Sequence, residues 1–365
     1  MNRRSFLLAS SGVCAAAAFG SDAPPHGKLG LNTYCLRALK WRDKELLDYA
    51  AGLKLDGVFL QDSLDPEIND LAHWREVGAY ARQLGLHIET GIGAVLPKDS
   101  ASFEASRTQL LLGIQRARAV GSPFVRCLHA ADRAHLPPGT IEQHRETMVK
   151  VLRSVKPQAV DAGLKFAIEN HKDLQAWEMR EVIEAAGPDF VGSYLETGNP
   201  VYVMEDPLVT LEHLGQYALC VHLRDSVIYE TPGGAMVQWV PLGEGTIDFP
   251  EFVKRLRKIK PEAYVYVKPI TGRPPDRIAW SEREFWNSYP HARAAEFARF
   301  LDLARRGRPY EKPIVIEDLP GKPMPEPFIA AVRFQQREHM ERSVAYAKQR
   351  LDLGERWRAY NDASR

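Results

Sequence analysis

The chain has 365 residues and a mass of 41.1 kDa, a length that suits one large domain or two ordinary ones. Hydrophobic residues make up 45% of the sequence and charged residues 26%, which is typical of soluble globular proteins and excludes disordered, collagen-like and fibrous classes. The 48 Lys and Arg residues nearly balance the 47 Asp and Glu residues without a block of like charge, so we expect no nucleic-acid partner.

The first 23 residues have the pattern of an export signal. Residues 2–8 (NRRSFLL) resemble a twin-arginine motif, an Ala-rich apolar run follows as far as Phe19, and small residues at Gly20, Ser21 and Ala23 offer a cleavage site. The apolar run is too short and too weakly hydrophobic to span a bilayer. We therefore expect a periplasmic or secreted protein with no stable membrane insertion after cleavage of the signal.

Cleavage at this position would leave three of the four cysteines, which are Cys35, Cys127 and Cys220. So few cysteines in a chain of this length exclude a disulfide scaffold. Each of the three lies among apolar residues, so we expect them to be buried as small hydrophobic side chains.

Eight short apolar runs, rich in β-branched or aromatic residues, predict strands. They are Leu29–Leu36, Gly57–Gln61, His87–Ile92, Phe124–His129, Lys165–Asn170, Val191–Glu196, Leu219–Arg224 and Tyr264–Ile270. Amphipathic segments between them predict helices, at Asp65–Leu84, Phe103–Val120, Thr140–Ala162, Glu178–Ala186, Phe252–Ile259 and Glu282–Arg306. Asp248 with Glu251, and Ser281 with Glu284, have the spacing of capping boxes at the starts of the last two helices.

This alternation predicts a parallel sheet, and eight such units without a dinucleotide-binding glycine motif or a P-loop predict a closed (β/α)8 TIM barrel. The predicted α/β barrel covers residues 28–306, and residues 307–365 form a C-terminal helical extension. The extension contains a Pro-rich connector, Pro309–Pro327, and a long helix, Phe328–Leu353. We expect it to pack on the barrel wall or on a partner subunit in a homo-oligomer.

Polar side chains follow several of the predicted strands, at the end where TIM barrels carry their catalytic groups. Glu169, Glu196, His222 and Lys268 end strands five to eight. Neighbouring members of the first three are about one βα unit apart, so we expect them to lie side by side at the rim. Two carboxylates and an imidazole suit a divalent metal such as Mn, Co, Mg or Zn. Such a metal would polarise a carbonyl while a nearby base moves a carbon-bound proton.

Four segments, "FAIENH", "YLETGNP", "VHLRDS" and "PLGEGTIDF", occur in this order along strands five to eight. Together they resemble the xylose isomerase-like TIM barrels, the sugar phosphate isomerase/epimerase superfamily, over about Lys28 to Trp286. The resemblance implies a divalent metal held by Glu169, Glu196, His222 and a strand-eight glutamate. It also implies isomerisation or epimerisation of a sugar by proton transfer beside a carbonyl, with glutamates such as Glu169 as bases.

The fourth ligand position departs from this pattern, because Lys268 in "YVKPITGRPP" stands where the family has glutamate. An ammonium there could replace the metal cation. Glu169, Glu196 and a protonated Lys268 without a metal have the same net charge as the family's three carboxylates with a dication. Alternatively, Glu169, Glu196 and His222 hold a metal with open positions, and Lys268 acts as base, acid or carbonyl partner. A shifted register of strand eight, in which another acid completes the site, is the third alternative.

Further polar and aromatic residues near the strand ends are candidate contacts for a sugar. Trp239, in a predicted loop Ser226–Gly245, is a candidate lid that stacks on a sugar ring. The other candidates are His129, His171, Asn199 and Arg224. For each of them, ordinary packing or loop hydrogen bonding is the alternative interpretation. No glycine pattern resembles a phosphate cradle.

These features predict a sugar or keto-sugar isomerase or epimerase with a divalent metal and a small-molecule carbohydrate as its partner. One alternative is a lyase on the same scaffold, either a decarboxylase or an eliminase of 3-keto-glycosides. Another is a sugar-binding protein without activity, in which Lys268 replaces the metal. A DNA-repair endonuclease of the same superfamily fits poorly, since it would need several metals and a basic face.

Overall fold

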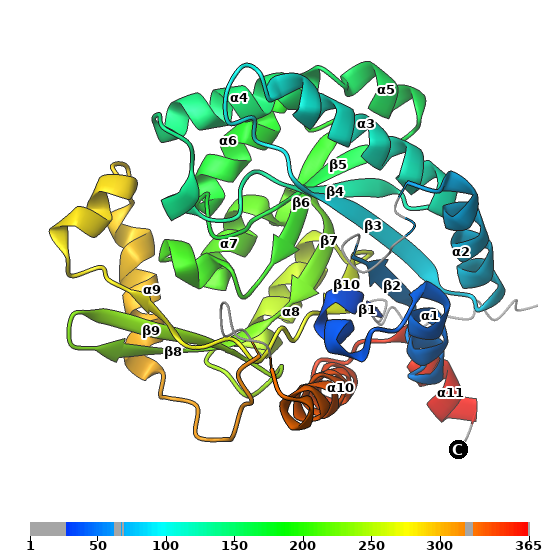
Figure 1. The fold of residues 1–365 in the computed structure, drawn as a ribbon. Helices are drawn as coiled ribbons and strands as arrows, with labels where there is room; N and C mark the ends of the chain where they lie inside the picture. Colours follow the sequence, from blue (N-terminus) through cyan, green and yellow to red (C-terminus); the bar gives the residue numbers. More distant parts are fainter. Residues whose placement is uncertain (1–26, 62–66, 68, 318–323, 364–365) are drawn as a thin grey trace, which may run out of the picture.

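Eight parallel strands close into a barrel with helices outside, which confirms the predicted TIM barrel (Figure 1). The computed structural model describes residues 27–61, 67, 69–317 and 324–363, so the predicted export signal lies outside the described residues. In chain order the barrel strands are β1 (Lys28–Asn32), β2 (Gly57–Leu60), β3 (His87–Ala94), β4 (Phe124–Leu128), β5 (Lys165–Glu169), β6 (Val191–Glu196), β7 (Ala218–Leu223) and β10 (Tyr264–Val267). All eight predicted strands are present, and β10 closes the barrel by pairing with both β1 and β7.

The first strand is shorter than predicted. Its pattern extended to Leu36, but β1 ends at Asn32, whose side chain accepts the backbone N–H of Tyr34. That hydrogen bond caps a 3-10 helix, Thr33–Leu39, in place of further strand.

Helices cover the outside of the barrel. They are α1 (Asp43–Gly52), α2 (Leu71–Gln83), α3 (Phe103–Val120), α4 (Ile141–Arg153), α5 (Lys156–Asp161), α6 (Ala176–Ala186), α7 (Pro207–Leu214) and α8 (Phe249–Ile259). Of these, α1 and α7 were not predicted. Side-chain caps fix two of the starts: Asp70 accepts two N–H groups at the start of α2, and Asp248 accepts the N–H of Glu251 in α8. The start of α2 is therefore later than the predicted Asp65, which lies outside the described residues.

Two predicted helices are interrupted at prolines. The segment Thr140–Ala162 forms α4 and α5, because Pro157 has no N–H to continue the α4 hydrogen bonds. The segment Glu282–Arg306 forms a 3-10 helix, Arg283–Ser288, and then α9 (Ala294–Arg306), with Pro290 between them. The 3-10 helix has no side-chain cap, so the capping box predicted at Ser281 and Glu284 is wrong.

The segment predicted as a loop, Ser226–Gly245, is mostly a β-hairpin. It contains β8 (Asp225–Thr231) and β9 (Gly234–Val240), which pair antiparallel, and β11 (Asp276–Ile278) adds to β9. The turn needs a residue with positive φ, and Gly233 supplies it at φ 90°. In Figure 1 this sheet projects beside α9, away from the barrel wall.

The C-terminal segment packs on the barrel wall through α10 (Glu326–Arg350), and α11 (Glu355–Ala363) follows it. Tyr49 of α1 donates a hydrogen bond to Glu341 of α10, and Gln336 of α10 accepts the N–H of Ala38. Arg257 of α8 donates to the carbonyl at the end of α10. The helix therefore lies between α1 and α8, where it covers β10 (Figure 1).

The barrel interior holds its own cluster of buried side chains, separate from the larger core between strands and helices. The cluster contains Phe59, Phe124, Ala167, Tyr194, Cys220 and Tyr266. All three cysteines of the described chain are buried and unbridged, as predicted. None of the described helices is long and apolar enough to span a bilayer.

Candidate functional site

Glu169, the last residue of β5, is completely buried between two cations. Arg126 of β4 donates from Nε to Glu169 Oε2 at 2.7 Å, and the Lys268 ammonium, just after β10, donates to Oε1 at 2.8 Å. Burial alone would raise the pKa of Glu169, but Arg126 and Lys268 hold that pKa well below its usual value. Burial lowers the pKa of Lys268, and the neighbouring Glu169 opposes that shift. Glu169 is therefore a carboxylate at neutral pH.

Glu196 at the end of β6 forms the second ion pair of the rim. Its Oε1 accepts Arg224 Nε at 2.7 Å, and its Oε2 accepts the backbone N–H groups of Gly198 and Asn199 at 3.0 and 2.7 Å. The segment Thr197–Asn199 thus folds back over its own strand end, and both carboxylate oxygens are occupied.

Asn199 connects the two ion pairs. Its Nδ2 donates to Glu169 Oε1 at 3.2 Å, and its Oδ1 accepts Arg224 Nη2 at 2.6 Å. The Arg224 guanidinium lies 4.0 Å above the ring of Trp239, whose Nε1 donates to the carbonyl of Gly198 at 3.3 Å. Five predicted site residues therefore share one hydrogen-bonded cluster, and Trp239 packs against it; the five are Glu169, Glu196, Asn199, Arg224 and Lys268. Trp239 itself lies on β9 and is 6% exposed.

His129 and His171 lie on the loops that follow β4 and β5. His129 Nδ1 is 2.7 Å from Asp173 Oδ2, and Nε2 has no hydrogen-bond partner among the described residues. His171 Nδ1 contacts the carbonyl of Ala131. Burial lowers the pKa of His171, so its ring is neutral at pH 7. His129 is fully buried, and its Nε2 is the ring nitrogen left without a hydrogen-bond partner among the described residues.

His222 is enclosed by aromatic rings in the barrel interior. Its ring stacks between Tyr194, at 3.9 Å, and Tyr266, at 4.7 Å, and the edge of Phe59 meets it at 5.1 Å. Burial lowers the pKa of His222 well below its usual value, so the ring is neutral. In register, His222 pairs with Glu196 of β6 on one side and with Tyr266, not Lys268, of β10 on the other.

The residues predicted to hold a metal are not arranged around one point. Across the described ranges, the one set of three acidic, His or Cys side chains whose ligand atoms lie within 4.8 Å of one another is Glu89, Cys220 and His222. The set Glu169, Glu196 and His222 does not meet that distance.

The charges at the rim also disfavour a dication. Two carboxylates, Glu169 and Glu196, face three cations, Arg126, Arg224 and Lys268, so the cluster already has a net charge of +1. All four carboxylate oxygens accept N–H donors. As arranged, the rim does not fit a divalent metal. It fits the alternative in which an ammonium takes the place of the metal.

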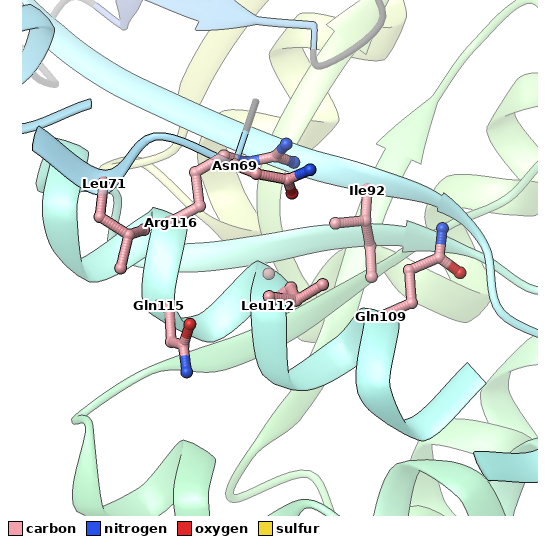
Figure 2. Close-up of a pocket in the computed structure, with 8 residues that line it drawn as sticks. Asn69, Leu71, Ile92, Gln109, Leu112, Gln115 and Arg116 are labelled. Carbon is pink, nitrogen blue, oxygen red and sulfur yellow. The ribbon is translucent and has the colours of Figure 1, made fainter. Parts of the chain in front are cut away.

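The structure also shows a pocket away from the rim, on the outer wall between α2 and α3 (Figure 2). Leu71, Ile92, Gln109 and Leu112 contribute to its lining, and Arg116 donates to the carbonyl of Gly91 at its inner side. It contains no predicted site residue and no cluster of titratable groups, so the candidate site remains the rim.

The candidate site lies at the strand ends of a TIM barrel, and comparison with known proteins gives the family. A sequence profile described as "Xylose isomerase-like TIM barrel" matches residues 47–289, more than half of the chain. The chain belongs to this family. The sequence prediction of the family is thus confirmed.

The individual proteins that are similar to this chain share only a low sequence identity with it. It is 26% identical over 219 residues to YihM, an uncharacterized protein of Escherichia coli K12, and the match covers 58% of this chain and 61% of YihM. The chain therefore spans less than two thirds of that relative. A D-psicose 3-epimerase, solved with D-fructose present, superposes with a TM-score of 0.56 at 17% identity, over 90% of this chain and 99% of the epimerase.

A second solved structure, the IolI protein with a bound zinc atom, gives a TM-score of 0.55 at 16% identity, over 76% of this chain and 98% of IolI. At these identities the superpositions show the shared fold. The zinc is that of IolI.

Proposed function

We propose that this protein is a sugar or keto-sugar isomerase or epimerase that moves a proton beside a carbonyl without a metal at the rim. The observation that carries the proposal is the clamp on Glu169, a buried carboxylate between the guanidinium of Arg126 and the ammonium of Lys268. Family membership supports the reaction class, and the surplus positive charge supports stabilisation of an enediolate oxygen.

Glu169 is the proposed base. A carboxylate held by two cations is a weak base, so its strength must increase when substrate binds. A substrate carbonyl oxygen that takes over the hydrogen bond of Lys268 would leave Glu169 with Arg126 as its one cation, beside the neutral amide of Asn199, and so raise its proton affinity. The carbon–hydrogen bond then breaks toward Glu169, its electron pair forms the enediolate, and Lys268 donates a hydrogen bond to the new oxyanion.

The outcome depends on where the proton returns. Return to the neighbouring carbon of the enediolate, while the hydroxyl proton on the first carbon passes to the oxyanion, gives isomerisation. Delivery of a proton to the opposite face of the first carbon, by solvent or a group other than Glu169, gives epimerisation. His129, with its unpartnered Nε2, is the proposed contact for a substrate hydroxyl. Arg224 and Asn199 are occupied by Glu196 and Glu169, so we assign them to positioning the rim.

A lyase is the second candidate. Burial lowers the pKa of Lys268, which makes a neutral amine more accessible than it is for an exposed lysine. Such an amine could condense with a keto group, release water, and withdraw electrons through the resulting iminium while a carbon–carbon or carbon–oxygen bond breaks. Trapping with borohydride would then attach the sugar to Lys268, and an isomerase using the ammonium would give no adduct.

The deciding experiment is proton exchange in heavy water. The full-length protein is incubated with ketoses, aldoses and 3-keto-glucosides, with and without EDTA, and deuterium beside the carbonyl is followed by NMR. We expect incorporation that is insensitive to EDTA and is lost in Glu169→Gln, with the exposed pair member Glu212→Gln as control. Exchange that requires added metal would contradict the metal-free rim. Sugar binding without exchange or elimination would favour the inactive binding protein.

We also propose, from the NRRSFLL segment, that the protein acts outside the cytoplasm. Cell fractionation of the full chain beside a variant with Arg3→Lys and Arg4→Lys tests this, because the loss of both arginines should retain the protein in the cytoplasm.

A further inference from the structure

A polar cluster lies inside the barrel, below the rim. Glu89 comes from β3, and Cys220 and His222 are alternate residues of β7, on the same face of that strand. In barrel order three strands separate β7 from β3, so these side chains meet across the interior. Their ligand atoms lie within 4.8 Å of one another, and the three residues are 1%, 0% and 0% exposed.

Two members of this cluster are buried without full hydrogen bonding. Both ring nitrogens of His222 and Oε2 of Glu89 have no partner of normal geometry within the described part of the chain, whereas Oε1 of Glu89 lies 3.0 Å from Nε2 of His87. Buried polar atoms are usually satisfied, so such a set of orphaned donors and acceptors at one point calls for a ligand. The stacked rings of Tyr194 and Tyr266 hold His222 in place, with its nitrogens at the ring edge.

We propose that Glu89, Cys220 and His222 bind a zinc-class dication inside the barrel. Carboxylate, thiolate and imidazole are the three ligand types that zinc takes in proteins. The charges close as well, because a carboxylate and a thiolate neutralise the dication beside a neutral imidazole. A neutral complex is what a site without access to water tolerates.

The distances need only a small adjustment. Zinc bonds of about 2.0–2.3 Å place neighbouring ligand atoms about 3.3–3.8 Å apart. The three ligand atoms, within 4.8 Å of one another, therefore have to move closer by about 1 Å or slightly more to bind one ion.

Enclosure by aromatic rings makes this a structural site with no position open to substrate. The ion would join β3 to β7 across the barrel beneath the rim. This assignment moves His222 away from the rim, where the family resemblance placed it, and does not depend on the proposed function. Glu169 and Lys268 could transfer protons whether or not the interior ion is bound.

Metal analysis of matched variants tests the site. Full-length protein refolded with zinc, or with cobalt, is freed of loose metal by gel filtration and analysed by plasma mass spectrometry. We expect stoichiometric zinc in the wild type, in Cys127→Ser, which changes a buried cysteine of β4, and in the rim variant Glu169→Gln. We expect loss of the metal in Cys220→Ser and in Glu89→Gln. The cobalt protein should show a thiolate charge-transfer band in the near ultraviolet.

Two results would overturn the proposal. One is a wild-type protein without bound metal after refolding with zinc. The other is metal that survives Cys220→Ser but is lost in Glu169→Gln, which would place it at the rim. If Cys220→Ser does not fold, the cobalt spectrum of the wild type decides alone, since absence of the thiolate band excludes Cys220 as a ligand.

Discussion

The ammonium of Lys268 lies 2.8 Å from Oε1 of Glu169, and the two side chains are 5% and 0% exposed. A buried carboxylate needs a compensating cation, and here that cation is covalently part of the chain. The family resemblance alone leads to a different expectation, a dication at the same place. Substituting one for the other changes the chemistry of the rim, because an ammonium donates hydrogen bonds where a metal accepts lone pairs.

Loss of Lys268 should therefore remove activity and also lower the free energy of unfolding, because it breaks a buried ion pair of Glu169. In Lys268→Met, Glu169 keeps Arg126, but no ammonium remains to face the developing oxyanion. We expect the deuterium exchange rate to fall by about 10²-fold or more, as when one oxyanion donor is removed. Lys268→Arg should retain part of the rate, and exposed Lys258→Met is the control. An unchanged rate in Lys268→Met would remove Lys268 from the mechanism.

Arg126 should contribute mainly to stability. Its removal in Arg126→Met leaves a buried carboxylate with one cation fewer, and breaking buried pairs of this kind typically costs about 3–5 kcal/mol. We expect a loss toward the lower end, about 3 kcal/mol in the free energy of unfolding by urea, because Lys268 remains. The matched variant is Arg299→Met, whose exposed pair with Glu212 should contribute less than about 1 kcal/mol. Equal losses in the two variants would contradict the role given to the buried clamp.

The strands and the family could be predicted because buried parallel strands are continuous apolar runs and because strand ends carry the motifs. Arg126 was missed, although its signal was present: a charged residue between Val125 and Cys127 in a buried strand requires a partner. The identity of that partner, Glu169, could not be predicted, since it depends on which strands become neighbours and in what register.

The sequence also could not predict which side chains surround His222 inside the barrel. The pairing of His222 with Tyr266 and of Glu169 with Tyr194 places aromatic rings on both sides of His222. The pairing of β6 with β7 shifts register after Ser193, and no local pattern predicts such an irregularity. The hairpin β8–β9, by contrast, has a local signal in the sequence. Its Pro-Gly-Gly turn between apolar runs is typical of a hairpin, although the prediction for this segment is a loop.

Trp239 should act by holding Arg224 and not by covering the sugar. It is 6% exposed, and the guanidinium of Arg224 already covers its ring. We expect Trp239→Ala to lower the free energy of unfolding by about 3–5 kcal/mol and to reduce kcat by releasing Arg224. Trp239→Phe keeps a ring beneath Arg224 and should leave KM within about twofold, given the small change in contact area. A large rise in KM for Trp239→Phe, with kcat maintained, would instead support the sugar-stacking lid predicted from the sequence.

The attachment of α10 to the barrel should depend on pH through His339. Nδ1 of this residue lies 2.7 Å from Oγ1 of Thr271, just beyond β10, and Nε2 lies 3.5 Å from Glu338. The other charged groups that act on it are Arg342, Glu244 and Lys312. Burial, and then Arg342, lower the pKa of His339 to about 4, so the folded protein keeps this ring neutral in mild acid.

In the unfolded chain the same imidazole has a pKa of about 6.5, so between these two values the unfolded state binds a proton that the folded state does not. Stability therefore falls as pH decreases from about 6.5 toward 4, by up to about 3 kcal/mol for this residue. We expect urea unfolding of the wild type to show this slope and His339→Gln to show a shallower one, with exposed His135→Gln unchanged from the wild type. Parallel pH profiles for the wild type and His339→Gln would mean that other groups carry the acid sensitivity of the fold.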